Sequence, residues 1–181
     1  MIQASPAAGQ RRQKSKYEHA SEQRRLHVAL YLSGVVDDAE RQYHWAFLVG
    51  PKVEKEDDVP GMRYHVKNTI VDGEVRWVYE ELDIRNVRMT NTLLARFAIA
   101  KVQDEKRLVE ILRSIPVIQE NPSWRCRTLA VGTAVLDWQK IEPAARKFVE
   151  GKKAAGRHND VNQMQQARPT FDLIQGREVS P

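Results

Sequence analysis

The hydrophobic periodicity of this chain changes once, from strand-like segments in the first half to helical spacing in the second. Leu26–Leu32 and Tyr43–Val49 have the apolar content of buried strands, and Asp72-Gly73 is a hairpin turn signal between two further strands. Beyond Asp104, leucine and isoleucine residues recur at helical spacing. A run of strands followed by a run of helices favours an α+β fold, with helices packed on one face of an antiparallel sheet.

The predicted sheet has four or five antiparallel strands, and three helices follow it. The expected strands are Leu26–Leu32, Tyr43–Val49, Arg63–Asn68, Glu74–Glu80 and, with a composition that also allows a helix, Leu93–Val102. The expected helices run from the N-cap Asp104 to the stop at Pro116, from Trp124 to about Gln139, and from Pro143, as first residue, to Glu150.

The chain of 181 residues is long enough for one globular domain with tails. We expect a disordered basic tail over residues 1–24, a single α+β domain over 25–150 and a polar C-terminal tail over 151–181. Neither tail shows the pattern of a buried face. The prediction is that removing both tails changes stability little.

The net charge of +5 resides mainly in these tails. Residues 1–25 carry +4, residues 151–181 carry +2, and the segment between them carries −1. A nucleic-acid-binding domain usually concentrates basic residues on a folded face, so we expect no dedicated nucleic-acid site, although a basic tail that touches nucleic acid or acidic lipid stays possible. No apolar run is long enough for a transmembrane segment or a signal peptide, which favours a cytoplasmic location.

The single cysteine, Cys126, follows a Pro-Ser pair and opens an apolar stretch. If Ser123 caps the expected helix, Cys126 lies in its first turn, beside Arg125 and Arg127. Unpaired backbone N–H groups, the helix dipole and neighbouring cations all lower the pKa of a thiol. We therefore predict an accessible, low-pKa thiol, against the common alternative that a lone cysteine is a small buried hydrophobic residue.

Two histidines are candidate partners of this thiol because they lie in consecutive predicted strands. His44 opens an almost continuously apolar strand, and His65 lies in the next one. Neighbouring antiparallel strands bring side chains of like parity together on one face. A thiol enzyme needs a thiolate, an imidazole base and a group that orients the imidazole, and Cys126, His44 and His65 supply these three types.

The same segments carry two resemblances. The stretch HWAFLVGPK, from His44 to Lys52, with RYHVKN, from Arg63 to Asn68, and the later WRC box resembles a family of small fungal proteins with no established activity. The arrangement also resembles the circularly permuted papain-like fold of the NlpC and lecithin:retinol-acyltransferase type. The latter resemblance implies that Cys126 is the nucleophile, His44 the base and His65 the residue that orients it.

We therefore expect a thiol-dependent hydrolase or acyltransferase that acts on an amide, ester or thioester of a small molecule or peptide and uses no cofactor. The alternative is a non-catalytic binding or interaction protein on the same fold. A metal site of Cys126, His44 and His65 is a weaker hypothesis, because the chain lacks paired ligand spacing. The consecutive carboxylates Glu80 and Glu81 point to opposite faces of a strand, which argues against a glycosidase. The sequence sets no oligomeric state.

Overall fold

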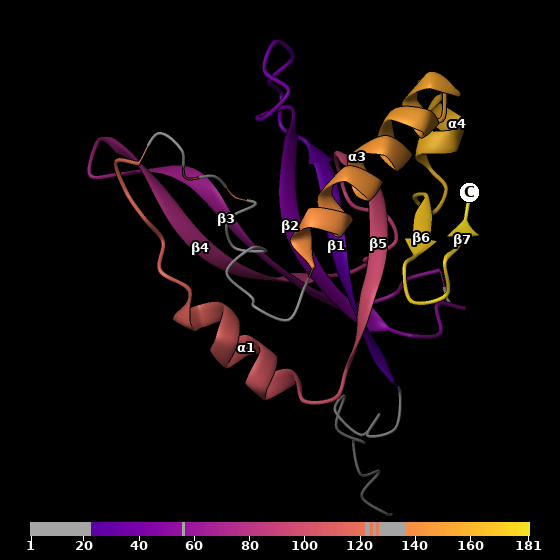
Figure 1. The fold of residues 1–181 in the computed structure, drawn as a ribbon, viewed down its shortest axis with the longest axis horizontal. Coiled ribbons are helices and arrows are strands. Elements are labelled where there is room, and N and C mark those ends of the chain that lie inside the picture. The colour runs from indigo at the N-terminus through magenta and orange to yellow at the C-terminus, as the bar shows by residue number, and fades with distance from the viewer. Residues whose placement is uncertain (1–22, 56, 122–123, 125, 127–136) are drawn as a thin grey trace, which may run out of the picture.

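The computed structural model describes residues 23–55, 57–121, 124, 126 and 137–181, which form an α+β fold around one sheet (Figure 1). The sheet has seven strands in the order β4-β3-β2-β1-β5-β6-β7, mostly antiparallel. The strands are β1 (Arg24–Leu32), β2 (Tyr43–Pro51), β3 (Gly61–Val71), β4 (Glu74–Ile84), β5 (Leu93–Val102), β6 (Thr170–Asp172) and β7 (Arg177–Ser180). The helices are α1 (Glu105–Ser114), α3 (Trp138–Ala154) and α4 (Val161–Met164).

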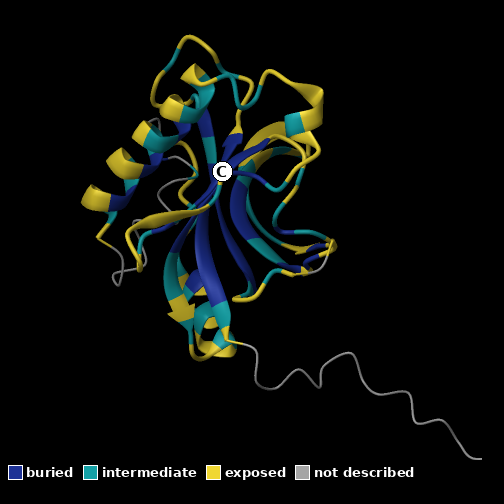
Figure 2. Cartoon of the chain, turned by 90° about the vertical axis from the view of Figure 1, so that its right-hand side faces the viewer, coloured by how far each residue is buried: buried dark blue, intermediate teal, exposed yellow. Residues whose placement is uncertain are grey.

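The predicted α+β class and the five predicted strands are confirmed, and the ambiguous segment Leu93–Val102 is strand β5. The most apolar strands lie at the centre: β1 pairs antiparallel with β2 on one side and with β5 on the other. Seven consecutive residues of β1 are buried, because the strand is covered on both faces. Figure 2 shows this buried centre surrounded by more exposed connections.

One face of the sheet carries the main core. Trp45, Phe47 and Val49 of β2 point into it, as the alternation of the strand predicts. Both long helices pack on this face, α1 through Leu112 and α3 through Ala145 and its buried neighbours. The expectation of helices on one face is therefore confirmed for α1 and α3.

The opposite face carries a smaller core that includes Ala46 and Leu48 of β2. Loops close it: Val59 comes from the β2–β3 connection and Val87 from the β4–β5 connection. A Cβ atom at Gly61 would lie 2.2 Å from the carbonyl oxygen of Val49 and 2.7 Å from a Val87 methyl group. Glycine at position 61 is thus required for the loops to approach the sheet.

The expectation of a C-terminal tail over residues 151–181 is corrected. Helix α3 continues to Ala154, and the chain then forms α4, β6 and β7. Strand β6 pairs in parallel with β5, which satisfies an edge that would otherwise be unpaired. Phe171 packs against the main core, while Thr170 and Asp172 are buried. Strands of three and four residues are too short for an alternating pattern to reveal, which is why the sheet exceeds the four or five predicted strands.

The first predicted helix is confirmed as α1. The side chain of Asp104 accepts a hydrogen bond from the Arg107 amide at 2.9 Å, and the helix ends just before Pro116. The expected helix from Trp124 to Gln139 falls mostly on residues 127–136, which lie outside the described part of the chain. Trp124 and Cys126 themselves are not helical, and Cys126 lies in a turn.

The helix expected to begin at Pro143 begins earlier, at Trp138. The amides of Lys140 and Ile141 both donate to the carbonyl of Asp137 at 3.1 Å, which establishes the first turn. Proline lacks an N–H group, so Pro143 cannot donate to the carbonyl of Gln139 one turn before it. Packing of Ile141, Ala145 and Val149 against the core outweighs this loss.

A buried ion pair holds the β2–β3 connection on the sheet. Arg96 of β5 is 1% exposed, and its guanidinium donates to both carboxylate oxygens of Glu54 at 2.8 Å. The same guanidinium donates to the hydroxyl of Thr170 at 3.1 Å. Arg96 therefore joins β5, β6 and the loop that closes the smaller core.

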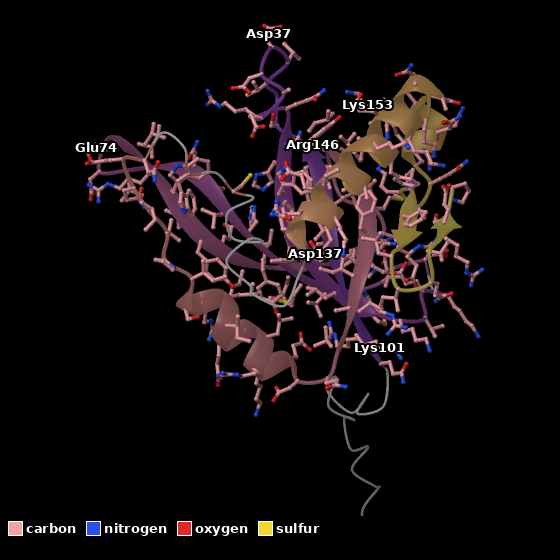
Figure 3. The ribbon with its side chains drawn as sticks, in the orientation of Figure 1. Asp37, Glu74, Lys101, Asp137, Arg146 and Lys153 are labelled. Carbon is pink, nitrogen blue, oxygen red and sulfur yellow. The ribbon has the colours of Figure 1, made fainter. Side chains whose placement is uncertain are left out.

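We predict that Glu54→Ala lowers the free energy of unfolding by about 3–5 kcal/mol, because it leaves a buried guanidinium without its counter-charge. Urea denaturation measures the change. The control is Glu74→Ala, which removes an exposed partner of Arg76 at the hairpin tip labelled in Figure 3 and is expected to cost less than about 1 kcal/mol. Equal losses in the two variants would show that the Arg96 pair does not hold the loop.

Candidate functional site

The strand register brings His44, His65 and Glu80 into one hydrogen-bonded chain. Residue 65 lies opposite Ala46, two residues from His44, so both imidazoles face the same side of the sheet. The Nε2 atom of His44 lies 2.8 Å from Nδ1 of His65. The Nε2 atom of His65 lies 2.7 Å from Oε2 of Glu80, the residue directly opposite it on β4. The expected contact between the two histidines is therefore present.

Glu80 and Lys67 are members of this cluster that the sequence analysis missed. Lys67 lies two residues beyond His65 on the same face, and its ammonium group lies 2.6 Å from the second oxygen of Glu80. The hairpin turn contains the signal that could have found Glu80. Asp72 and Gly73 both have positive φ, as a two-residue turn requires, so residue 71 pairs with 74 and His65 with Glu80.

The hydrogen-bond chain fixes the tautomer of both rings. A carboxylate only accepts, so His65 donates its Nε2 proton to Glu80 and, as a neutral ring, leaves Nδ1 as an acceptor. His44 must then donate from Nε2 to His65, which leaves Nδ1 of His44 without a proton. The cluster thus presents a basic ring nitrogen at Nδ1 of His44.

The electrostatics of the cluster keep both rings neutral. Burial lowers the pKa of His44 to about 4, and repulsion from the Arg63 guanidinium, and from His65 when it is protonated, acts in the same direction. Burial also lowers the pKa of His65, although its hydrogen bond to Glu80 opposes this shift. The hydrogen bond from Lys67 is the main cause that lowers the pKa of Glu80 and keeps its carboxylate ionised.

The β2–β3 pairing ends beside His44 and opens the sheet. Only four residue pairs join these strands, from Ala46 opposite His65 to Val49 opposite Met62. In the β1–β2 ladder the Ser33 amide donates to Gln42 and the Lys52 amide to Gln23, so the amide of Trp45 points toward β3. No pairing to β3 is formed at Trp45 within the described ladder. The Trp45 amide donates instead to the sulfur of Cys126, at 3.4 Å.

Two contacts at the outer edge of the sheet position the segment that carries Cys126. The side-chain amide of Gln119 pairs with the backbone of Trp77 on β4, accepting from its N–H at 3.0 Å and donating to its C=O at 2.9 Å. The buried Trp124 ring then packs edge-on against the Trp77 ring, with centroids 5.1 Å apart. From this anchor, Cys126 reaches the amide of Trp45.

Cys126 and His44 lie on opposite faces of strand β2, near Trp45. Cys126 is half-buried against the main core, whereas His44 projects from the other face of β2. The sulfur contacts the backbone of Trp45, next to His44 in the chain. β3 does not pair with β2 at this level, and β2 itself lies between the two side chains. The direct contact between the thiol and the imidazole stays a prediction.

His27 does not belong to this cluster. His27 is buried on β1, where burial and then Arg96 hold the pKa of its ring well below the usual value. Among the residues that the structure describes, no group of three His, Cys, Asp or Glu side chains is arranged to hold a metal ion. In the same part of the chain, no helix has the length and apolar character needed to cross a bilayer.

The depressed pKa of His44 predicts acid sensitivity. The His44 ring has a pKa of 6.5 in the unfolded chain and about 4 in the folded protein. Between these two pH values the ring takes up a proton when the protein unfolds, so the free energy of unfolding decreases as the pH falls through this range. We expect His44→Gln to remove part of this pH dependence. Urea denaturation from pH 7 to pH 4 measures the slope for both proteins. Identical slopes would contradict the neutral, buried state of His44.

Comparison with known proteins gives a family and no activity. No curated protein and no solved structure matches the chain. A family profile matches residues 23–180, which include every strand and helix described above and every residue of the site. The chain therefore belongs to DUF6914, a family of unknown function.

Proposed function

We propose that this protein is a thiol-dependent hydrolase or acyltransferase, with Cys126 as nucleophile and His44 as base. The observation that carries the proposal is the unprotonated Nδ1 atom of His44, which results from its hydrogen bond to His65 and that of His65 to Glu80. His44 precedes Trp45 in the chain, and the Trp45 amide donates to the Cys126 sulfur. A base, a nucleophile and an orienting group are the three parts that acyl transfer through a thiol needs.

In the proposed reaction, the Cys126 sulfur attacks the carbonyl carbon of an amide, ester or thioester as its proton passes to Nδ1 of His44. The tetrahedral intermediate collapses when the bond to the leaving group breaks, and the imidazolium returns the proton to that group. Water or another acceptor then attacks the thioester on Cys126 and gives its proton to His44. The C–S bond breaks, the acyl product leaves, and the imidazolium returns the proton to the sulfur to restore the free thiol. The acyl substrate is a small molecule or peptide.

Each remaining residue of the chain has a positioning role in this proposal. His65 accepts from Nε2 of His44 and so keeps the proton off Nδ1. Glu80 fixes the tautomer of His65, and Lys67 holds the carboxylate of Glu80 in its ionised form.

The proposal differs in one respect from the low-pKa thiol expected from the sequence. His44 is neutral near pH 7, since its pKa is lowered to about 4, so it supplies no cation to stabilise a thiolate in the resting protein. The Trp45 N–H is a donor that favours a negatively charged sulfur. His44 acts by removing the thiol proton during the reaction. A free thiol persists where thiols are kept reduced, and we place the protein in the cytoplasm.

The alternative function is a binding or interaction protein in which Cys126 is structural. The packing of Cys126 against the main core is the observation that favours it. In that case the His44, His65 and Glu80 cluster stabilises the β2–β3–β4 arrangement and performs no proton transfer. Thiol reactivity and acyl turnover distinguish the two functions.

The first test measures alkylation of Cys126 in the native protein by iodoacetamide at pH 7. If His44 takes the thiol proton, His44→Gln slows the reaction by about 10-fold or more. The control variant Lys101→Gln removes an exposed charge from β5, outside the cluster, and is expected to react like wild type. Equal rates for all three proteins, or no labelling before denaturation, would favour the structural role of Cys126.

A second test uses hydrolysis of p-nitrophenyl acetate and the paired carboxylates of β4. Cys126→Ala is expected to abolish turnover. Glu80→Gln should lower kcat about 10- to 100-fold, because an amide also donates and no longer fixes the His65 tautomer. The matched control is Glu81→Gln: the adjacent residue faces the other side of the sheet and pairs with Arg113 of α1. An equal loss in both variants would indicate a general structural effect.

A further inference from the structure

A second cluster of titratable side chains lies at the C-terminal end of α3, away from the Cys126 region. The last turn of the helix contains Lys152 and Lys153, and Gly156 beyond it adopts a φ of +76°. This left-handed residue lets the Arg157 amide donate to the Lys152 carbonyl and the Gly156 amide to the Lys153 carbonyl. The reversal brings Arg157 and His158 back beside the last turn of the helix.

Two arginines converge next to this turn. Arg157 donates from Nη1 to the carbonyl oxygen of Gln163 at 2.6 Å and from Nη2 to that of Ala167 at 3.0 Å. Nη1 of Arg168 approaches the same Gln163 oxygen at 3.5 Å. Two guanidinium groups that share one neutral acceptor repel each other. Among the described residues, neither arginine forms an ion pair with a carboxylate.

Two buried nitrogen atoms in this cluster have no hydrogen-bond partner. They are Nε2 of His158 and Nε of Arg168, and the side-chain oxygen Oε1 of Gln163, an acceptor, is also buried without a partner here. Arg168 is only 5% exposed, so water contributes little to its solvation. Nε of Arg168 always carries a hydrogen, and a buried N–H group without an acceptor beside excess positive charge is what an anion would satisfy.

The groups around His158 are predominantly positive. Burial lowers the pKa of His158 to about 4, and Arg157, Arg168, Lys153 and Lys152 add to this shift. The two lysines are already compensated, since Lys152 pairs with Glu178 and Lys153 with Glu150. The positive charge of the two arginines is the part that lacks a counter-charge.

We propose that Arg157, His158 and Arg168 form a binding site for the phosphoryl group of a phosphate or phosphomonoester. A tetrahedral dianion offers several acceptor oxygens, which suit the neighbouring guanidinium groups and an imidazole that takes up a proton when the anion binds. The site is assembled from the turn after α3 and from the residues just before β6, and it does not depend on the thiol chemistry.

The test follows His158 of the full-length protein by NMR, with sodium phosphate against sodium chloride at equal ionic strength. Bound phosphate is expected to raise the pKa of His158 by about 1 unit or more, because it supplies the missing negative charge. The melting temperature should rise with phosphate and not with chloride. Unchanged His158 titration and an unchanged melting temperature in phosphate would overturn the proposal.

Variants test which residues bind the anion. Arg157→Gln and Arg168→Gln are each expected to weaken phosphate binding at least 10-fold by calorimetry. His158→Gln, which removes no buried guanidinium, provides the same test if an arginine variant does not fold. The control is Lys101→Gln, a charge change at the far end of the sheet from Lys153 (Figure 3). An equal loss of phosphate affinity in Lys101→Gln would show that the affinity depends only on net charge, which would overturn the proposed site.

A final comparison identifies the source of the phosphoryl group. Glycerol 3-phosphate and inorganic phosphate are titrated separately into the wild-type protein. Tighter binding of the ester supports a phosphomonoester ligand, whereas tighter binding of inorganic phosphate supports the free ion. Binding of neither, at millimolar concentration, contradicts the proposal.

Discussion

The short pairing between β2 and β3 is the constraint on which the candidate site depends. β3 is 11 residues long, yet it pairs with β2 over only four positions before the two strands diverge. The paired part places His65 on the same face as His44 and fixes the 2.8 Å contact between their rings. The diverged part leaves the Trp45 amide without a strand partner, and the sulfur of Cys126 takes that place. One strand junction therefore positions both histidines and the thiol.

The charges and the burial around this junction favour one arrangement of protons on the two imidazole rings. Glu80 lies at the solvent side of the chain, and Lys67 holds its charge there. His65 is buried, and His44 is half-buried beside the buried ring of Tyr31, with ring centroids 6.0 Å apart. Negative charge at one end and burial at the other favour a neutral His44 with an unprotonated Nδ1. With a pKa of about 4, Nδ1 of His44 is a weak base near pH 7 in the resting protein.

The fold keeps its two polar clusters apart. The His44 chain lies where β2, β3 and β4 meet, and the arginine cluster lies where α3 returns to the sheet through β6. Between them, the Arg96 and Glu54 pair ties β5 and β6 to the loop over the smaller core. The C-terminal segment is thus a structural part of the domain, since it completes the β5 edge and supplies partners for Arg96.

The sequence by itself determined the local elements and several site residues. Alternation placed Trp45 in the main core and His44 on the other face, and the turn at Asp72-Gly73 carries the register that pairs His65 with Glu80. Tertiary structure decided the rest. The parallel β5–β6 pairing joins segments more than 70 residues apart, and strands as short as β6 carry no periodic signal. The contact of Cys126 with the Trp45 amide depends on a segment remote in sequence from β2, which Gln119 anchors on Trp77 of β4. Local propensity and periodicity cannot specify such contacts, because they arise only when segments remote in sequence compete for the same backbone groups.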